Sequence, residues 1–183
     1  MENKNNGFLP DGYKAPEGAY YKLKDGENTF RILSSAVTGY EYWNKENKPI
    51  RSSTPFQSTP ADIKLDDKGK ATSIKHFWIF VVTNEDNQIQ IMEITQKSIQ
   101  SAIRSLVENP KWGDPKGYDI TINKAGNGLS TEFSVMPNPH SEAPKIDISH
   151  INLKNMLVNE DPFGPPATES VEEVVKKLNK KEI

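Results

Sequence analysis

Clustered aromatic and basic side chains are the residues of this sequence best suited to chemistry. Three aromatic residues fall within 40–43, with Lys45 after them, and a lysine, a phenylalanine and a tryptophan fall within 75–78. Aromatic rings stack on nucleobases of any identity for about 1–3 kcal/mol per base, and cations contact phosphates. These side chains therefore favour binding of an unpaired nucleic-acid strand. The candidate contacts are Arg31, Tyr40, Tyr42, Trp43, Lys45, Lys75, Phe77, Trp78 and Lys124.

Most of these candidates have a purely structural alternative. Tyr40, Tyr42 and Trp43 suit a stacking platform, but they could equally pack together under the loop that follows them. Alternation along the strand turns Phe77 outward, where it contacts a base or is covered by the same loop, and it turns Trp78 toward the core. The aromatic clusters alone leave the choice between binding surface and packing open.

Arg31 lies opposite Phe30 and Ile32 in an alternating segment, so we expect its side chain to point away from the core. A phosphate contact is the functional interpretation, and a surface ion pair is the alternative. Lys124 begins a glycine-rich connection between two strands. Trp112 is expected to pack beneath the sheet rather than to bind a base.

Residues typical of catalysis are scattered through the chain. His76, His140 and His150 have no nucleophile at a telling spacing, there is no cysteine, and no glycine-rich phosphate-binding loop is present. The acids at 66–67 and 114 fall in turns, where such residues commonly form the turn itself. We therefore expect a protein that is not an enzyme and uses no cofactor or metal.

Composition limits where a nucleic-acid site could lie. The 183 residues carry a net charge of −2, with 34% hydrophobic and 26% charged residues. Residues 159–183 account for that −2, so the rest of the chain is neutral and a basic site must be a local stripe. No apolar run reaches the roughly 20 residues of a membrane span, and the first residues form no signal core. A cytosolic address is the default expectation.

A hairpin at 74–94 organises the predicted fold. Its first strand is apolar on both faces, so either both faces are covered or one offers aromatic surface to a ligand. Three prolines and many polar residues predict that 44–73 is a loop without regular structure. The other predicted elements are one long, curved strand over 29–43, strands at 118–123 and 131–136, and a helix from Thr95 to Asn109 with its apolar stripe at 99–106. Pro137 and Pro139 are expected to end the sheet, and a short helix from Ser149 to Leu157 and a helix after Ser170 are expected to follow.

The order strand, strand, strand, helix, strand, strand is that of the OB fold, a five-stranded barrel that binds oligonucleotides. We therefore expect a mainly β protein with one helix between strands 3 and 4 and a C-terminal helical extension. The predicted organisation is a flexible arm over 1–19, an OB-fold domain over 20–140 and an extension over 141–183.

Several short motifs, in order, resemble the OB-fold single-stranded DNA-binding proteins of bacteriophages and prophages. The resemblance covers about 18–140. The motifs are YYKLKDGENTFRIL at 20–33, GYEYW at 39–43, KHFWIFVV at 75–82, QIMEITQ at 90–96, NPKWGDPKGYDITI at 109–122 and GLSTEFSVMP at 128–137.

This resemblance implies binding of single-stranded DNA without sequence preference, in phage DNA replication or recombination within the cytoplasm of the bacterial host. It also implies phage replication or recombination proteins as partners of the C-terminal extension, whose last stripe could pair with a second copy of the chain. The acidic segment ending at Phe163 is similar to the partner-docking tail of such proteins, but here it is internal. An OB-like module that binds a protein instead of DNA is the alternative, and the neutral body supports it.

Overall fold

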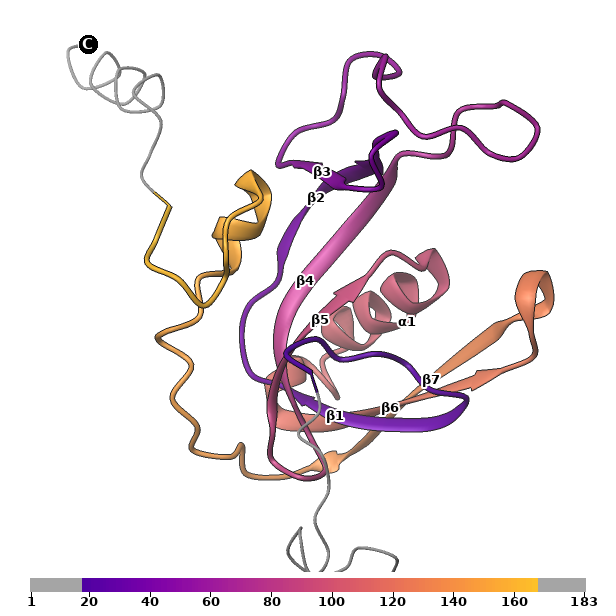
Figure 1. The fold of residues 1–183 in the computed structure, drawn as a ribbon. Coiled ribbons are helices and arrows are strands. Elements are labelled where there is room, and N and C mark those ends of the chain that lie inside the picture. Colours follow the sequence, from indigo (N-terminus) through magenta and orange to yellow (C-terminus); the bar gives the residue numbers. More distant parts are fainter. Residues whose placement is uncertain (1–17, 168–183) are drawn as a thin grey trace, which may run out of the picture.

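The long strand β4 is the axis of the fold. The computed structural model describes residues 18–167, whose seven strands form one antiparallel sheet. Figure 1 shows how the strands are arranged. The strands are β1 (Gly26–Ile32), β2 (Val37–Trp43), β3 (Pro49–Ser52), β4 (Lys75–Asn84), β5 (Ile89–Ile94), β6 (Tyr118–Ala125) and β7 (Glu132–His140). The helices are α1 (Lys97–Glu108) and the short 3-10 turns η1 (Pro115–Gly117), η2 (Gly128–Ser130) and η3 (Leu153–Val158).

β1 and β2 share one edge of β4, and β5 takes the other edge. The first half of β4 pairs with β2, from Lys75 opposite Glu41, and its last three residues pair with β1. The remaining order runs β1-β6-β7, and β3 lies outside β2. The prediction of a mainly β fold is confirmed, but among the described residues the sheet has seven strands, two more than predicted, and β5 and β7 do not pair to close it.

Both faces of β4 are covered, which was one of the two alternatives for this doubly apolar strand. On the inner face, Phe80 and Val82 pack with Ile99 and Ile103 of α1 and with residues of β1 and β6. On the outer face, Phe77, Ile79 and Val81 pack under Leu153 and Met156 from the C-terminal extension. The strand is apolar on both sides because it lies between two clusters.

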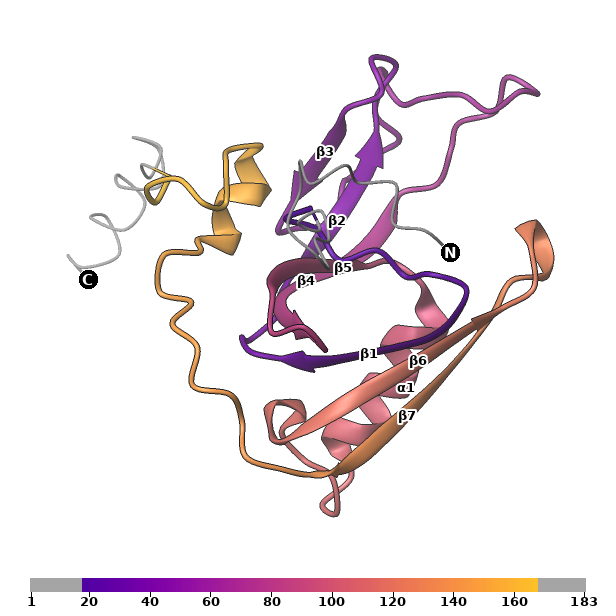
Figure 2. The ribbon, with the colours of Figure 1, turned by 60° about the horizontal axis from the view of Figure 1, so that its bottom comes forward.

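The helix follows its apolar stripe closely. α1 begins at Lys97 with Gln96 as its N-cap residue, one residue later than Thr95 would have placed it. Ile99 and Ile103 are buried, and the helix stops at Asn109 before Pro110, as predicted. It packs against β7, and Figure 2 shows it behind β6 and β7.

Two predictions about irregular structure are wrong. Residues 44–73 contain β3, which begins at Pro49 on the free edge of β2, where a missing N–H costs no ladder bond. β7 continues through Pro137 and Pro139 to His140, because it too is the last strand of the sheet and its ladder slips by a bulge beside Ile120.

The C-terminal extension leaves the sheet after His140 and returns along its outer face. A 3-10 turn, η3, replaces the short helix expected from Ser149 and begins only at Leu153. The predicted flexible arm, except for residues 18 and 19, and the helix after Ser170 lie outside the described residues.

Candidate nucleic-acid interface

One turn design is used three times around β4. In each case an Asn or Asp side chain accepts hydrogen bonds from the backbone N–H groups two and four residues ahead, at 2.9–3.0 Å. The fourth residue of each turn has a positive φ, which Asn and Gly tolerate best. The three turns begin at Asn44, Asp66 and Asn84.

Two of these turns bring the chain around an open groove beside Trp43. The Lys64 N–H donates to the Trp43 carbonyl at 2.7 Å, and the Thr72 N–H donates to the Lys64 carbonyl at 2.9 Å. The predicted loop is therefore a hydrogen-bonded extension of β2. The groove, about 700 Å³, is lined by Trp43, Asn47, Lys64, Asp66, Ala71, Thr72, Ser73 and Lys75; we call it the Trp43 groove.

The groove combines an accessible ring with uncompensated cations. The Trp43 side chain is 44% exposed. Lys64 Nζ lies 2.7 Å from the Asn47 side-chain oxygen, which is neutral. Within the described residues neither Lys64 nor Lys75 forms an ion pair with an acid. One plane for a base and two positive charges for phosphates are the elements of a single-strand contact.

The segment around the groove is basic in an otherwise acidic chain. Seven cations and only four acids fall within 44–75, whereas the whole chain has a net charge of −2. This segment is the local stripe that the neutral body required. The cations are Lys45, Lys48, Arg51, Lys64, Lys68, Lys70 and Lys75, and the acids are Glu46, Asp62, Asp66 and Asp67.

Of the predicted contacts, the structure brings Trp43 and Lys75 together in the groove and leaves Lys45 exposed on the adjoining turn. Lys64 was missed. The one signal for Lys64 in the sequence is its place next to the apolar Ile63, which is buried, so that alternation turns Lys64 outward. The three prolines of the same stretch obscured that pattern.

The other two aromatics of the 40–43 cluster serve packing. Tyr42 is buried, its hydroxyl donates to Asp62 at 2.8 Å, and its ring meets Phe56 edge-on. Burial, reinforced by Asp62, raises the pKa of the Tyr42 hydroxyl. Tyr40 is half-buried against the His76 ring, 5.1 Å away. For Tyr42 the alternative of packing under the loop is thus correct. Of the three aromatic residues, Trp43 is the one that remains available to stack on a base.

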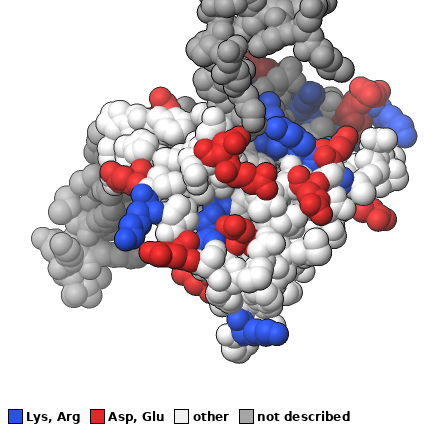
Figure 3. Space-filling view, turned by 90° about the horizontal axis from the view of Figure 1, so that it is seen from below, with Lys and Arg blue, Asp and Glu red and all other residues white. Residues whose placement is uncertain are grey.

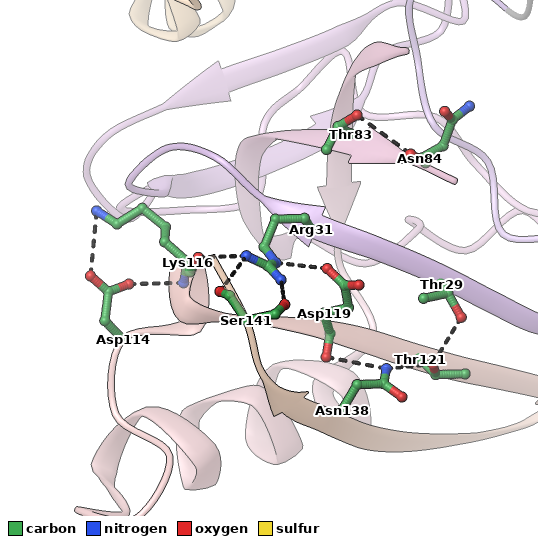
Figure 4. A network of polar contacts seen from close by, with 10 residues as sticks. All are labelled: Thr29, Arg31, Thr83, Asn84, Asp114, Lys116, Asp119, Thr121, Asn138 and Ser141. Atoms are coloured by element: carbon green, nitrogen blue, oxygen red, sulfur yellow. Dashed lines mark hydrogen bonds and ion pairs between the residues drawn. The ribbon is translucent and has the colours of Figure 1, made fainter. Parts of the chain in front are cut away.

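Arg31 does not point away from the protein. It is 4% exposed and forms a 2.7 Å ion pair with Asp119. Its other nitrogens donate to the Lys116 carbonyl and to the carbonyl and hydroxyl of Ser141 (Figure 4). The alternative of an ion pair is therefore the one seen, although it is buried, because the chain after β7 folds across the outward face of Arg31 and uses its donors. The phosphate contact of Arg31 stays a prediction.

Three further candidates also lie away from the groove or out of reach. Phe77 lies on the outer face, as predicted, and the covered alternative is the one seen: it is fully buried under the C-terminal extension, with Arg51 of the 44–73 stretch over its ring. Trp78 is half-buried against the inner core, as predicted. Lys124 pairs with Asp25 at 2.9 Å, far along the sheet from Trp43.

The opposite end of β4 has grooves but not the same charge. Two grooves of about 470 and 300 Å³ flank the turn at Asn84. Figure 3 shows this end from below, with acidic groups set among the basic ones and no continuous basic stripe. The acids that line the two grooves are Glu27, Glu85, Asp86, Asp119 and Glu142.

The described residues hold no group of acids and histidines arranged to bind a metal ion. Over the same range, none of the helices has the length and apolarity to cross a membrane.

Comparison with known proteins agrees with the sequence motifs. The chain is similar to a protein of Escherichia phage T5 named "Probable ssDNA-binding protein", with 27% identity over 138 residues. The match covers 63% of this chain and 53% of the relative, so the chain spans about half of that protein's length. No protein-family model and no solved structure matches the chain. The phage T5 match confirms the resemblance to phage single-stranded DNA-binding proteins that the motifs indicated.

Proposed function

We propose that this protein binds single-stranded DNA without sequence preference and is not an enzyme. One base stacks on Trp43, and phosphates on either side contact Lys64 and Lys75. The observation that carries the proposal is an exposed indole in an open groove with two lysines that form no ion pair within the described residues, in the segment where the chain concentrates its positive charge. The name of the phage T5 relative supports single-stranded DNA as the ligand.

We also infer an OB-like barrel, left open on one side. The ladder β5-β4-β1-β6-β7, with α1 between β5 and β6 in the chain, has the element order expected of that fold. In this frame β4 and β5 are strands 2 and 3, and 44–73 is the long loop that leads into strand 2. The Trp43 groove thus lies where OB folds hold oligonucleotides.

The biological setting is proposed on the phage T5 resemblance. We infer a role in phage DNA replication or recombination in the cytoplasm of the bacterial host, with replication or recombination proteins, or a second copy of the chain, as partners of the C-terminal extension.

Titration with oligo-dT tests the function. Tryptophan fluorescence should be quenched on binding, because Trp43 stacks on a base, and the affinity should fall steeply with salt as counterions are released. Unchanged fluorescence and mobility with excess oligo-dT at low salt would contradict the proposal. That result would favour the alternative of a protein-binding module.

A further inference from the structure

The Trp43 groove lies on the same face of the sheet as the covered apolar cluster. Side chains alternate along a strand, so Trp43 and Glu41 share one face of β2. In the ladder between β2 and β4, Glu41 lies opposite Lys75 and Gly39 lies opposite Phe77. Lys75 and Phe77 are therefore on that face too. Starting from the groove, this outer face therefore continues past Glu41 to Phe77, Ile79 and Val81.

Gly39 shows how closely the strands are packed on this face. A Cβ atom at Gly39 would come within 2.8 Å of the Phe77 ring and nearer still to the Ser52 carbonyl oxygen. Arg51 of β3 lies over the same ring, 5.8 Å from its centre, and bonds to Glu41 and Glu93. A ring with a guanidinium above it thus lies immediately beyond the exposed groove.

The C-terminal cover, residues 148–167, closes this part of the face. Leu153 and Met156 are buried on Phe77, Ile79 and Val81. Figures 1 and 2 show the cover standing beside the sheet, joined to β7 by a long extended connection.

Polar contacts hold the cover together but do not attach it to the sheet. Among the described residues, every hydrogen bond made by 142–167 stays within that segment, and none of its side chains forms an ion pair with the sheet. The buried Asn155 side chain bonds to the backbone at Asp161, Pro165 and Ala167, each at 2.8 Å. Within the part of the chain that the structure describes, the cover is therefore a self-contained unit that rests on the sheet through apolar contacts.

The root of the cover is fixed. The Arg31 side chain bonds to Ser141, and the Ser141 N–H donates to the Gly117 carbonyl. The chain is thus attached to the sheet at Ser141, continues as an extended connection, and then contacts the sheet through apolar side chains. A segment attached in this way can leave the sheet without unfolding it.

We propose that the C-terminal cover is a displaceable lid on the outer face, and that single strands long enough to pass beyond the Trp43 groove displace it to reach Phe77 and Arg51. This proposal rests on the proposed function and adds its regulation: short strands bind without moving the cover, and long strands bind in competition with it.

Hydrogen exchange on the wild-type protein tests the displacement without any substitution. Amides of η3 should exchange at least about tenfold faster with a saturating oligo-dT of about 16 nucleotides, and at an unchanged rate with one of about 4, the range of site sizes of OB folds. Unchanged exchange with the long oligomer bound would overturn the lid. Failure of both oligomers to bind would instead overturn the proposed function.

A matched pair of variants tests the competition. Met156→Asp places a charge against the apolar face, whereas Val158→Asp changes a residue of the same turn that is 57% exposed. Met156→Asp should raise the affinity for the long oligomer by about three- to tenfold and leave the short one unchanged, and Val158→Asp should change neither. Equal affinities in all three proteins contradict the proposal, and if Met156→Asp does not fold, the wild-type exchange result decides.

Discussion

The two ends of β4 use the same kind of turn, yet the turns differ in charge. At the Trp43 end, the turns at Asn44 and Asp66 each place a lysine as their fifth residue. At the far end, the turn at Asn84 carries Glu85 and Asp86 instead. Ten residues of β-strand separate the two ends by about 30 Å.

This difference shows that the backbone sets the geometry of the turns, whereas the side chains set the charge around them. The Asx hydrogen bonds and the positive φ recur at both ends, so turn geometry alone does not make a binding site. At the Trp43 end, Lys64 and Lys75 form no ion pair with an acid within the described residues, whereas the far end uses Arg31 in a buried network. We therefore expect substitutions at one end to alter binding and substitutions at the other to alter stability.

The largest expected effect is on stability. Arg31→Met removes an ion pair and the bonds to Lys116 and Ser141, and should lower the free energy of unfolding by about 2–4 kcal/mol while oligo-dT affinity of the folded protein stays unchanged. Denaturant melts and a titration of the same variant measure both. Lys124→Gln, which breaks the exposed pair with Asp25, is the control and should cost under about 1 kcal/mol. A weaker affinity in folded Arg31→Met would restore the phosphate role of Arg31.

The next effect is on binding. Trp43→Ala should weaken oligo-dT binding by about 1–3 kcal/mol, roughly 5- to 150-fold, because one stacked base is lost. Tyr20 is the matched control, since it is equally exposed, at 46% against 44%, but belongs to the acidic end. Tyr20→Ala should leave the affinity within about twofold of wild type. Equal losses of oligo-dT affinity in the two variants would contradict the proposal that only the Trp43 end binds DNA.

Glu41 lies opposite Lys75 at the Trp43 end and supplies a pH dependence of stability. Burial, with the neighbouring Glu93 carboxylate, raises the pKa of Glu41 from 4.5 to about 7. Because the folded state holds this proton more tightly than the unfolded state, its stabilising effect is complete below pH 4.5 and is lost as the pH rises through 7. The wild-type free energy of unfolding should fall by about 1–2 kcal/mol more than that of Glu41→Gln between pH 5 and pH 8, after allowance for solvent screening. Parallel pH profiles in denaturant melts would contradict the shift.

The smallest effect is on salt dependence. Lys64→Gln and Lys75→Gln should each reduce the slope of log affinity against log salt by about 0.7, the value for one phosphate contact on a single strand. Lys22→Gln, beside the acidic grooves, should leave the slope unchanged. A reduced slope in Lys22→Gln would place phosphates at the far end of β4 as well.

The spacing of apolar residues and the positions of Asn and Pro predicted several of the strands and the helix well. The β4–β5 hairpin, α1 and the end of α1 at Asn109 follow from alternation, a helical stripe and an Asn-Pro stop. β3 was missed because proline density was taken to exclude strands, although Pro49 opens an edge strand that needs no N–H there.

The site was harder to predict than the fold, since exposure depends on what distant segments cover. Phe77 and Arg31 have the residue types and strand positions of nucleic-acid contacts. They are buried because residues after 140 return across both: Ser141 bonds to Arg31, and Met156 packs on Phe77. The alternation of residues along a strand does not indicate that a distant segment will cover it. Trp43 could be proposed from the sequence because its loop is local to it.

Photocrosslinking locates the strand on the protein and tests the central claim most directly. Oligo-dT carrying 5-iodouracil, irradiated in complex with the wild-type protein, should attach to Trp43 and to peptides within 64–75. Crosslinks confined to the residues that line the acidic grooves, within 18–29 or 84–90, with none at Trp43, would contradict the account.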